Sequence, residues 1–231
     1  MELEVHPIQA DILLVLLFKP VARFVDLNTT GMSTDHFTFH VKRLVKLGLI
    51  CKDKKNNYLL TPRGKEFANR FDTDSVIVER QAKLGVVVIC VKEVRDTLHM
   101  LVQKRLKQPY FGYYGFVTGK IRWGEELLVA ASRELKEETG LSGDLELVGI
   151  EHKIDYSKDE RLLEDKFFYI FRAEDTKGKL IKEFVGGENK WLSEKDIRKL
   201  PNLFDDMWEL IGVIKGKKLV FFEKKFKVKS Y

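Results

Sequence analysis

Residues 119–141 read GKIRWGEELLVAASRELKEETGL, and this stretch decides the fold of the second half of the chain. Its fixed spacing is Gly119-x5-Glu125-x7-Arg133-Glu134-Leu135-x-Glu137-Glu138-x-Gly140-Leu141. On a helix, Glu134, Glu137 and Glu138 lie three and four positions apart and share one face. Like charges at this spacing repel by only about 0.2–0.5 kcal/mol a pair. A solvated helix tolerates that cost, so the energy alone does not separate a plain surface from a ligand site.

The chemistry of the three glutamates suits a metal ion. Carboxylates on a rigid helix face form a hard-oxygen site for Mg²⁺ or Mn²⁺. Bound divalent ions convert the repulsion into coordination, and they neutralise a diphosphate before water attacks phosphorus. We expect Gly119 to allow a close approach of metal or phosphate, and Gly140 to permit the left-handed turn that ends the helix. The expected apolar stripe that seats the helix is Leu127, Leu128, Ala131 and Leu135.

The same spacing is that of the Nudix box, and the chain from Val76 onward resembles the Nudix hydrolase superfamily. The resemblance implies an α/β/α sandwich with a mixed sheet, Mg²⁺ or Mn²⁺ as cofactor, and a nucleotide-derived diphosphate as substrate. It implies that Glu137 and Glu138 are the principal metal ligands, and that Glu134 is a ligand or the general base. Glu125 is then an outer or second-metal carboxylate, the Gly119 carbonyl a further ligand, and Arg133 the residue that holds a glutamate in place. We assign the general base to Glu134.

Three features beside the box leave alternatives open. Relatives often supply a further acid from a later loop, for which Glu188 in GGENKWLS is our candidate and Glu183 its competitor, unless both are merely solvated. Residues 117–120, Val-Thr-Gly-Lys, depart from the commoner proline and paired glycines, which leaves the substrate class open. The aromatic side chains of Tyr110, Phe111, Tyr113, Tyr114 and Phe116 fit either a nucleobase-stacking surface or a core.

Residues 6–71 predict a different kind of domain: three helices, a hairpin and a further helix. Pro7 suits a first helical position, and a second short helix is expected over 21–27. Ser33 caps a third helix, which Gly48 closes. Short strands at 50–52 and 58–60 flank a polar turn, and Thr61-Pro62 begins the last helix. The apolar stripe expected on the third helix is Phe37, Val41, Leu44 and Val45.

This order resembles the winged helix-turn-helix family of DNA-binding domains, most clearly in STDHFTFHVKRLVKLGLI and LLTPRGKEFA. The resemblance implies that the helix over 33–47 enters a major groove of double-stranded DNA and that the hairpin lies along phosphates. Phe39 departs from the pattern that this resemblance implies, because its side chain is expected on the face of the helix opposite the apolar stripe. It fits contact with a thymine methyl, or a homodimer or interdomain contact. The side chains expected to face nucleic acid are Thr38, Lys42, Arg43, Lys46, Lys52, Lys54 and Lys55.

Length and charge agree with two domains. The 231 residues suit a winged helix domain over 1–75 and a Nudix domain over 76–231, with the boundary at the polar stretch 72–75. The net charge of +6 is concentrated: residues 36–65 hold eight Lys or Arg and one acid, which suggests an anionic partner.

The lysine-rich end, 215–229, is expected to form a half-exposed edge strand. The apolar runs are too short for a membrane span, and we expect a cytoplasmic protein with both Cys51 and Cys90 reduced in the core.

The sequence thus predicts a Mg²⁺-dependent hydrolase that cleaves the pyrophosphate bond of a nucleoside diphosphate linked to another group. A DNA-binding winged helix would precede it. The alternative is a transcriptional regulator whose Nudix domain senses a nucleotide-derived metabolite. The intact box favours hydrolysis, because a pure sensor does not need all four glutamates. A third reading makes the winged helix a dimerisation or RNA-contacting element.

Overall fold

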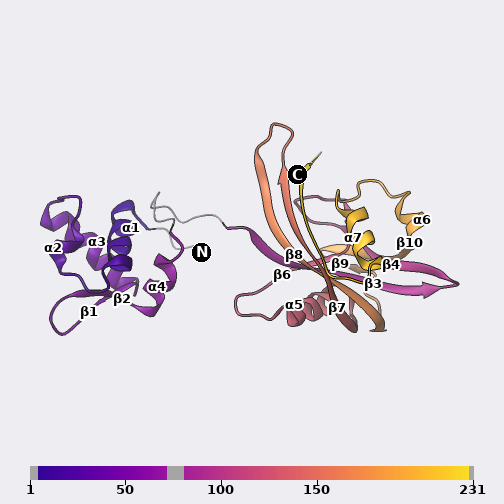
Figure 1. The fold of residues 1–231 in the computed structure, drawn as a ribbon, viewed down its shortest axis with the longest axis horizontal. Coiled ribbons are helices and arrows are strands. Elements are labelled where there is room, and N and C mark those ends of the chain that lie inside the picture. The colour runs from indigo at the N-terminus through magenta and orange to yellow at the C-terminus, as the bar shows by residue number, and fades with distance from the viewer. Residues whose placement is uncertain (1–4, 72–80, 229–231) are drawn as a thin grey trace. The chain divides into compact units, whose positions relative to one another are not determined.

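The structure is a computed structural model that describes residues 5–71 and 81–228 (Figure 1). The chain divides into two compact units, Met1–Arg80 and Gln81–Tyr231. The expected boundary at 72–75 lies outside the described residues. Within the described ranges, no helix has the length and apolar character needed to cross a membrane.

The N-terminal unit has the expected order of elements. These are α1 (Pro7–Phe18), α2 (Phe24–Leu27), α3 (Thr34–Lys46), β1 (Ile50–Lys52), β2 (Tyr58–Leu60) and α4 (Pro62–Ala68). Helix α2 is shorter than the predicted 21–27, because the backbone of Ala22 pairs with Tyr58 instead, with N···O distances of 3.1 and 2.8 Å. Side chains of α1, α3 and α4 enclose one apolar core. The sequence therefore predicted these elements correctly, apart from the start of α2.

Two details of this unit follow from its packing. Phe37, Val41 and Leu44 of α3 are buried, but Val45 is exposed, so the apolar stripe is narrower than expected. Thr61 caps α4 by accepting a hydrogen bond from the Gly64 N–H at 2.9 Å. A Cβ at Gly64 would lie 1.8 Å from the Leu49 carbonyl oxygen, so α4 sits directly on the turn that follows α3.

The C-terminal unit is built on one mixed sheet. In the described residues the strand order is β11-β7-β8-β3-β4-β10-β9, with β5 on β4 and β6 on β3. The pairs β11–β7 and β3–β8 are parallel, and the others are antiparallel. The elements are β3 (Lys83–Val94), β4 (Thr97–Arg105), β5 (Tyr114–Gly115), β6 (Val117–Lys120), α5 (Leu127–Thr139), β7 (Leu141–Tyr156), β8 (Leu162–Gly178), β9 (Glu183–Phe184), β10 (Gly187–Ser193), α6 (Glu194–Ile197), α7 (Met207–Lys215) and β11 (Val220–Lys227).

The central strand β3 shows why helices cover both faces of the sheet. Successive strand residues point to opposite faces. Accordingly Val86, Val88 and Cys90 belong to a core with α5, whereas Val87, Ile89 and Val91 belong to a core with α6 and α7. Helices α5 and α7 lie on opposite sides of the sheet (Figure 1). The expected mixed α/β architecture is confirmed.

Two expectations need correction. The stretch GGENKWLS, residues 186–193, was expected to be a loop, but Gly187–Ser193 form strand β10, which pairs with β4 from Gly187 opposite Arg105 to Ser193 opposite His99. The paired glycines suggested a loop, but only Val185 and Gly186 lie between β9 and β10, and Gly187 is already paired in the sheet. Cys90 is buried as expected, but Cys51 is exposed.

Charged side chains form a buried cluster on the face that carries α7. Lys153 Nζ lies 2.6 Å from Asp206 Oδ2, and both side chains are buried. Lys166 Nζ and the Tyr110 hydroxyl each donate to Asp155 Oδ2 at 2.8 Å. Burial, followed by the charge of Asp206, raises the pKa of Glu151 to about 9. Burial therefore favours the neutral form of Glu151, and the Lys153 ammonium lies near the carboxylates of Asp206 and Asp155.

Candidate active site

Helix α5 presents the box glutamates at one end of the sheet. It begins after Glu126 and ends at Gly140, whose φ of +73° is left-handed as predicted. Ala130, Ala131 and Leu135 are buried against the sheet. Leu128, expected in this stripe, is exposed. The helix is therefore seated by two alanines and Leu135, which lets its backbone approach the sheet closely.

Arg133 is the centre of the box. Its Nε and Nη2 donate to the two carboxylate oxygens of Glu125 at 2.7 and 2.8 Å. Its Nη1 donates to Glu134 Oε1 at 2.6 Å, and Nη2 also donates to the Lys120 carbonyl at 3.0 Å. The hydrogen bond from Arg133, together with the Arg122 N–H, lowers the pKa of Glu125 to about 2. Glu125 is thus a charged anchor for Arg133, and Arg133 fixes Glu134.

Gly119 makes room for Glu134. A Cβ at Gly119 would lie 1.9 Å from Glu134 Cδ and 2.0 Å from its Cγ. In the structure, the side chain of Glu134 is the neighbour that requires glycine at this position. Strand β6 and helix α5 meet at this contact. The position of β6 is fixed by its pairing with β3, in which Gly119 lies opposite Val86.

Replacing Gly119 by alanine is expected to displace the Glu134 carboxylate and lower kcat by roughly 10²-fold, since misplacement by about 1 Å has effects of that size. Steady-state kinetics on the best nucleotide substrate would measure it. Gly212→Ala is the matched control, because no heavy atom lies within 4 Å of a Cβ there. Equal kcat for Gly119→Ala and wild type would show that this contact does not position Glu134.

A network of hydrogen bonds from strands β4 and β10 holds Glu138. Gln103 Nε2 donates to Glu138 Oε2 at 3.0 Å and to Asn189 Oδ1 at 3.3 Å. Asn189 Nδ2 donates to the backbone oxygens of Glu138 and Ile181 at 2.8 and 2.9 Å. Burial raises the pKa of Glu138, and the charge of nearby Glu134 acts in the same direction. The sequence did not point to Gln103 or Asn189, because each lies next to charged residues in its strand and no spacing links the two amides.

The three helix glutamates differ in exposure. The side chains of Glu134 and Glu138 are 12% and 13% exposed, whereas Glu137 is 53% exposed. The Glu137 carboxylate lies 3.3 Å from Arg133 Nη1 and 3.5 Å from Arg122 Nη2. Two carboxylates are therefore fixed, and the third stands at the outer edge of the group.

The structure does not bring Glu188 to this group. In β10, Asn189 lies opposite Gln103 and Glu188 lies opposite Lys104. Because neighbouring strand residues point to opposite faces, Glu188 projects away from the face on which Asn189 and Gln103 reach Glu138. Its carboxylate lies 3.9 Å from Lys190 Nζ. We therefore leave Glu188 out of the proposed site.

The donor chemistry fits Mg²⁺ or Mn²⁺. As the side chains stand, the described residues hold no group of three or more His, Cys, Asp or Glu arranged for a metal ion. Arg133 takes both oxygens of Glu125 and one oxygen of Glu134. Glu134 and Glu138 nevertheless place hard oxygen donors near each other, and Glu137 is exposed enough to turn toward them. Among the expected ligands, the carboxylates free enough to hold a metal ion here are therefore Glu134, Glu137 and Glu138.

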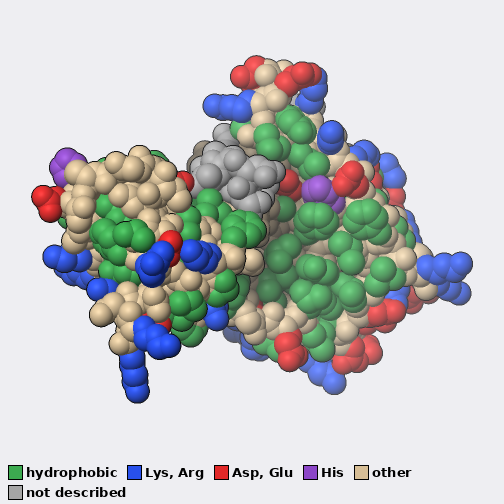
Figure 2. Space-filling model, turned by 60° about the vertical axis from the view of Figure 1, so that its left-hand side comes forward, with side chains coloured by type: hydrophobic (Ala, Val, Ile, Leu, Met, Phe, Trp, Pro, Cys, Tyr) green, Lys and Arg blue, Asp and Glu red, His purple; other side chains and the backbone are tan. Residues whose placement is uncertain are grey.

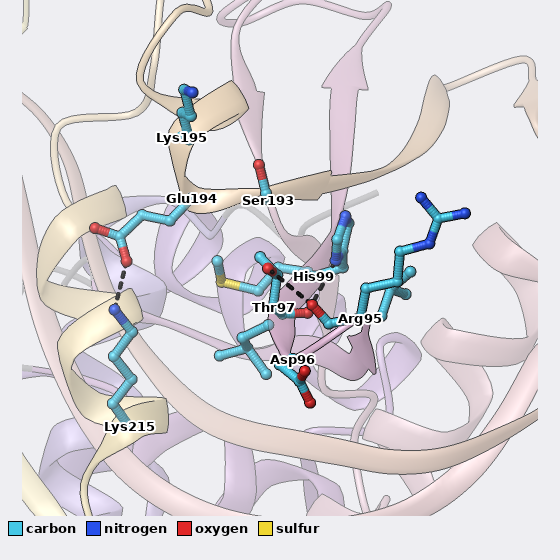
Figure 3. Close-up of a pocket in the computed structure, with 11 residues that line it drawn as sticks. Arg95, Asp96, Thr97, His99, Ser193, Glu194, Lys195 and Lys215 are labelled. Carbon is cyan, nitrogen blue, oxygen red and sulfur yellow. Dashed lines mark hydrogen bonds and ion pairs between the residues drawn. The ribbon is translucent and has the colours of Figure 1, made fainter.

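The Nudix unit also has a pocket that is separate from the glutamates of α5. It has a volume of about 630 Å³ and lies at the β3–β4 turn, where Arg95, Asp96, Thr97 and His99 face Glu194 and Lys215 (Figure 3). Thr97 is six residues from Gln103 along β4, which is roughly 20 Å in an extended strand. The box therefore lies at the opposite end of β4 from this pocket.

Comparison with known proteins identifies the family. The NUDIX domain model matches residues 82–211, which is more than half of the chain. The chain belongs to the NUDIX family. With its complete box, it is a Nudix pyrophosphohydrolase. Enzymes of this family generally use divalent metals such as Mg²⁺.

Solved structures share the fold of the Nudix unit. The MutT protein of Bacillus halodurans is 22% identical, with a TM-score of 0.54 over 64% of this chain and 93% of that one. The NUDIX domain of Shewanella oneidensis NrtR, solved with ADP ribose, is 21% identical, with a TM-score of 0.51 over 68% of this chain and 97% of that one. No curated protein matches the chain in sequence.

The candidates for nucleic-acid contact lie outside the Nudix unit, on α3 and the β1–β2 turn. The Thr38 hydroxyl donates to the Thr34 carbonyl at 2.6 Å, so it is engaged within its own helix. The Asp53 carboxylate orders the turn by accepting N–H bonds from Lys55 and Asn57, each at 2.8 Å. Phe39 is exposed. Six cations are exposed and have no acidic partner within 4 Å among the described residues: Lys42, Arg43, Lys46, Lys52, Lys54 and Lys55.

Proposed function

We propose that the Nudix unit cleaves the pyrophosphate bond of a nucleoside diphosphate linked to another group, with Mg²⁺ or Mn²⁺ as cofactor. The observation that carries this proposal is the pair of fixed carboxylates: Glu134 on Arg133, and Glu138 on Gln103. A ligand of the proposed class, ADP ribose, is present in the structure of the NrtR NUDIX domain.

Each box residue then has a role. Glu137 and Glu138 would hold the divalent ion, which neutralises phosphate charge and makes water a better nucleophile when bound. Arg133 holds one oxygen of Glu134 at 2.6 Å, so its other oxygen is left to accept a proton from water as general base. Lys107, whose Nζ is 4.0 Å from Glu138 Oε1, and exposed Arg122 supply positive charge for phosphate oxygens.

A nucleotide panel tests the proposal. Purified full-length protein with Mg²⁺ is expected to convert at least one nucleoside diphosphate derivative into a nucleoside monophosphate and a second phosphate ester. Glu137→Gln should reduce that turnover, whereas Glu183→Gln, which alters an exposed carboxylate on β9, should not. Equal turnover by Glu137→Gln and wild type, or no hydrolysis across the panel, would contradict the proposal.

For the N-terminal unit we infer a winged helix that binds double-stranded DNA. Its support is the group of six exposed cations on α3, β1 and the β1–β2 turn, none of which has an acidic partner within 4 Å in the described part of the chain. Lys and Arg side chains stand out from the surface of this unit (Figure 2). Such cations contact phosphates, and each contact adds to the salt dependence of binding.

Lys54→Glu is expected to weaken DNA binding and to reduce the slope of log K against log salt by about 1. Fluorescence anisotropy with genomic DNA fragments at several salt concentrations measures both quantities. Lys225→Glu makes the same charge change on exposed β11 and should retain wild-type affinity. Unchanged affinity and slope for Lys54→Glu would exclude the turn from the interface.

The regulator remains the second candidate function, in which a nucleotide-derived ligand of the Nudix unit changes DNA affinity. Exposed Phe39 on α3 favours a further alternative, a homodimer contact through the same helix. Repeating the anisotropy titration with and without ADP ribose tests the regulator, because linkage requires the ligand to shift the DNA affinity. Sedimentation of wild type and Phe39→Ala tests the dimer.

A further inference from the structure

Trp123 is displayed at the tip of the box loop. Its side chain is 91% exposed. The Glu125 N–H donates to the Arg122 carbonyl at 3.0 Å, and Gly124 has a φ of +76°. Residues 122–125 therefore form a tight turn with Trp123 at its corner, which directs the indole away from the core.

This turn is anchored rather than loose. The Arg122 N–H donates to Glu125 Oε2 at 2.9 Å, and the same carboxylate accepts hydrogen bonds from two nitrogens of Arg133. Arg133 in turn holds Glu134. The turn that presents Trp123 is thus tied to the residue that positions the assigned general base. A preorganised aromatic surface loses little conformational freedom when a ligand binds to it.

The turn that carries Trp123 reaches the outer edge of the glutamate group through Arg122. The preceding residue, Arg122, places Nη2 3.5 Å from Glu137 Oε1. A diphosphate held at the glutamates would therefore have a cation and then a large π surface next to it. Nucleobases stack on such surfaces, since every base offers a π face.

The aromatic stretch 110–116 is less suited to this role. Tyr110 and Phe116 are buried, and Tyr113 and Tyr114 are half-buried. Tyr110 and Tyr113 pack against Phe204 with ring centroids 5.3 and 5.4 Å apart. Of these five aromatics only Phe111 is exposed. Most of the stretch therefore serves the core, and Phe111 is the rival to Trp123.

We propose that Trp123 stacks on the nucleobase of the substrate and is a specificity-determining residue of the Nudix unit. The inference rests on the proposed hydrolysis of a nucleoside diphosphate derivative. It assigns the base to the box loop and the diphosphate to the glutamates, with Arg122 between them.

Kinetics with ADP ribose as probe test this assignment in the full-length protein. Trp123→Ala should raise KM about 10-fold and change kcat less than KM, because a stacking contact made before and during reaction acts mainly on binding. Trp123→Phe should restore most of the affinity. Phe111→Ala, the matched aromatic truncation, should keep the wild-type KM.

Tryptophan fluorescence gives an independent readout. ADP ribose should quench the emission of wild type, and inorganic pyrophosphate should not; in Trp123→Phe the quenching should be lost. A wild-type KM for Trp123→Ala, an increased KM for Phe111→Ala alone, or undiminished quenching in Trp123→Phe would overturn the inference while hydrolysis stands. If wild type hydrolyses no nucleotide of the panel, the proposed function itself fails.

Discussion

Replacing Glu134 by glutamine is expected to lower kcat by roughly 10²–10⁴-fold, the range for loss of a positioned acid–base group. Glutamine has nearly the same shape and keeps one oxygen to accept the Arg133 hydrogen bond, which measures 2.6 Å in the wild type. It removes the negative charge and the basic oxygen that would accept the proton from water. Steady-state kinetics with Mg²⁺ on the best substrate of the panel measures the loss.

The control for this prediction is the residue just before the same helix. Glu126 precedes α5, is exposed, and makes no side-chain cap. Glu126→Gln changes the same net charge and should keep kcat within about two-fold, since surface substitutions away from such features have small effects. A Glu134→Gln enzyme with nearly wild-type kcat would place the general base on another carboxylate.

The second large effect concerns stability. Lys153→Met is expected to reduce the free energy of unfolding of the Nudix unit by about 3–5 kcal/mol, as removal of one partner of a buried ion pair does. Lys153 Nζ lies 2.6 Å from Asp206 Oδ2, and the substitution leaves that buried carboxylate uncompensated. Asp155, also buried, loses the same nearby cation. Urea unfolding followed by tryptophan fluorescence reports this unit, because Trp123, Trp191 and Trp208 all lie in it.

The exposed ion pair of Lys227 and Glu160 provides the control for Lys153→Met. Lys227 lies 2.7 Å from Glu160, and both side chains are well exposed. Lys227→Met should change the free energy of unfolding by less than about 1 kcal/mol, because solvent screens exposed pairs. If Lys153→Met unfolds at the same urea concentration as Lys227→Met, the buried cluster does not stabilise the unit as described.

Elements with a strong local pattern could be predicted from the sequence. Helix α5 and its left-handed end at Gly140 follow from the spacing of residues 119–141, and β3 follows from the apolar run at 84–91. Helices α3 and α4 begin after Ser33 and Thr61 as predicted, although of these two residues only Thr61 makes a capping hydrogen bond with its side chain. In each case the signal lies within a few residues of the element itself.

Features that depend on strand register could not be predicted. Glu188 and Asn189 are adjacent in sequence, but only the pairing of β10 with β4 shows which of them reaches the Glu138 side. Glu151, Lys153 and Asp155 alternate with less polar residues, a pattern typical of an exposed strand face. The structure buries them because α7 and β11, distant in sequence, flank that part of β7.

The most direct test is a Mn²⁺ titration of the full-length protein, followed by electron paramagnetic resonance of the free ion. Wild type should bind Mn²⁺ with saturation; Glu138→Gln should lower the affinity by at least roughly 10-fold, and Glu126→Gln should leave it unchanged. Equal Mn²⁺ affinity for Glu138→Gln and wild type would show that the glutamates of α5 do not hold the ion.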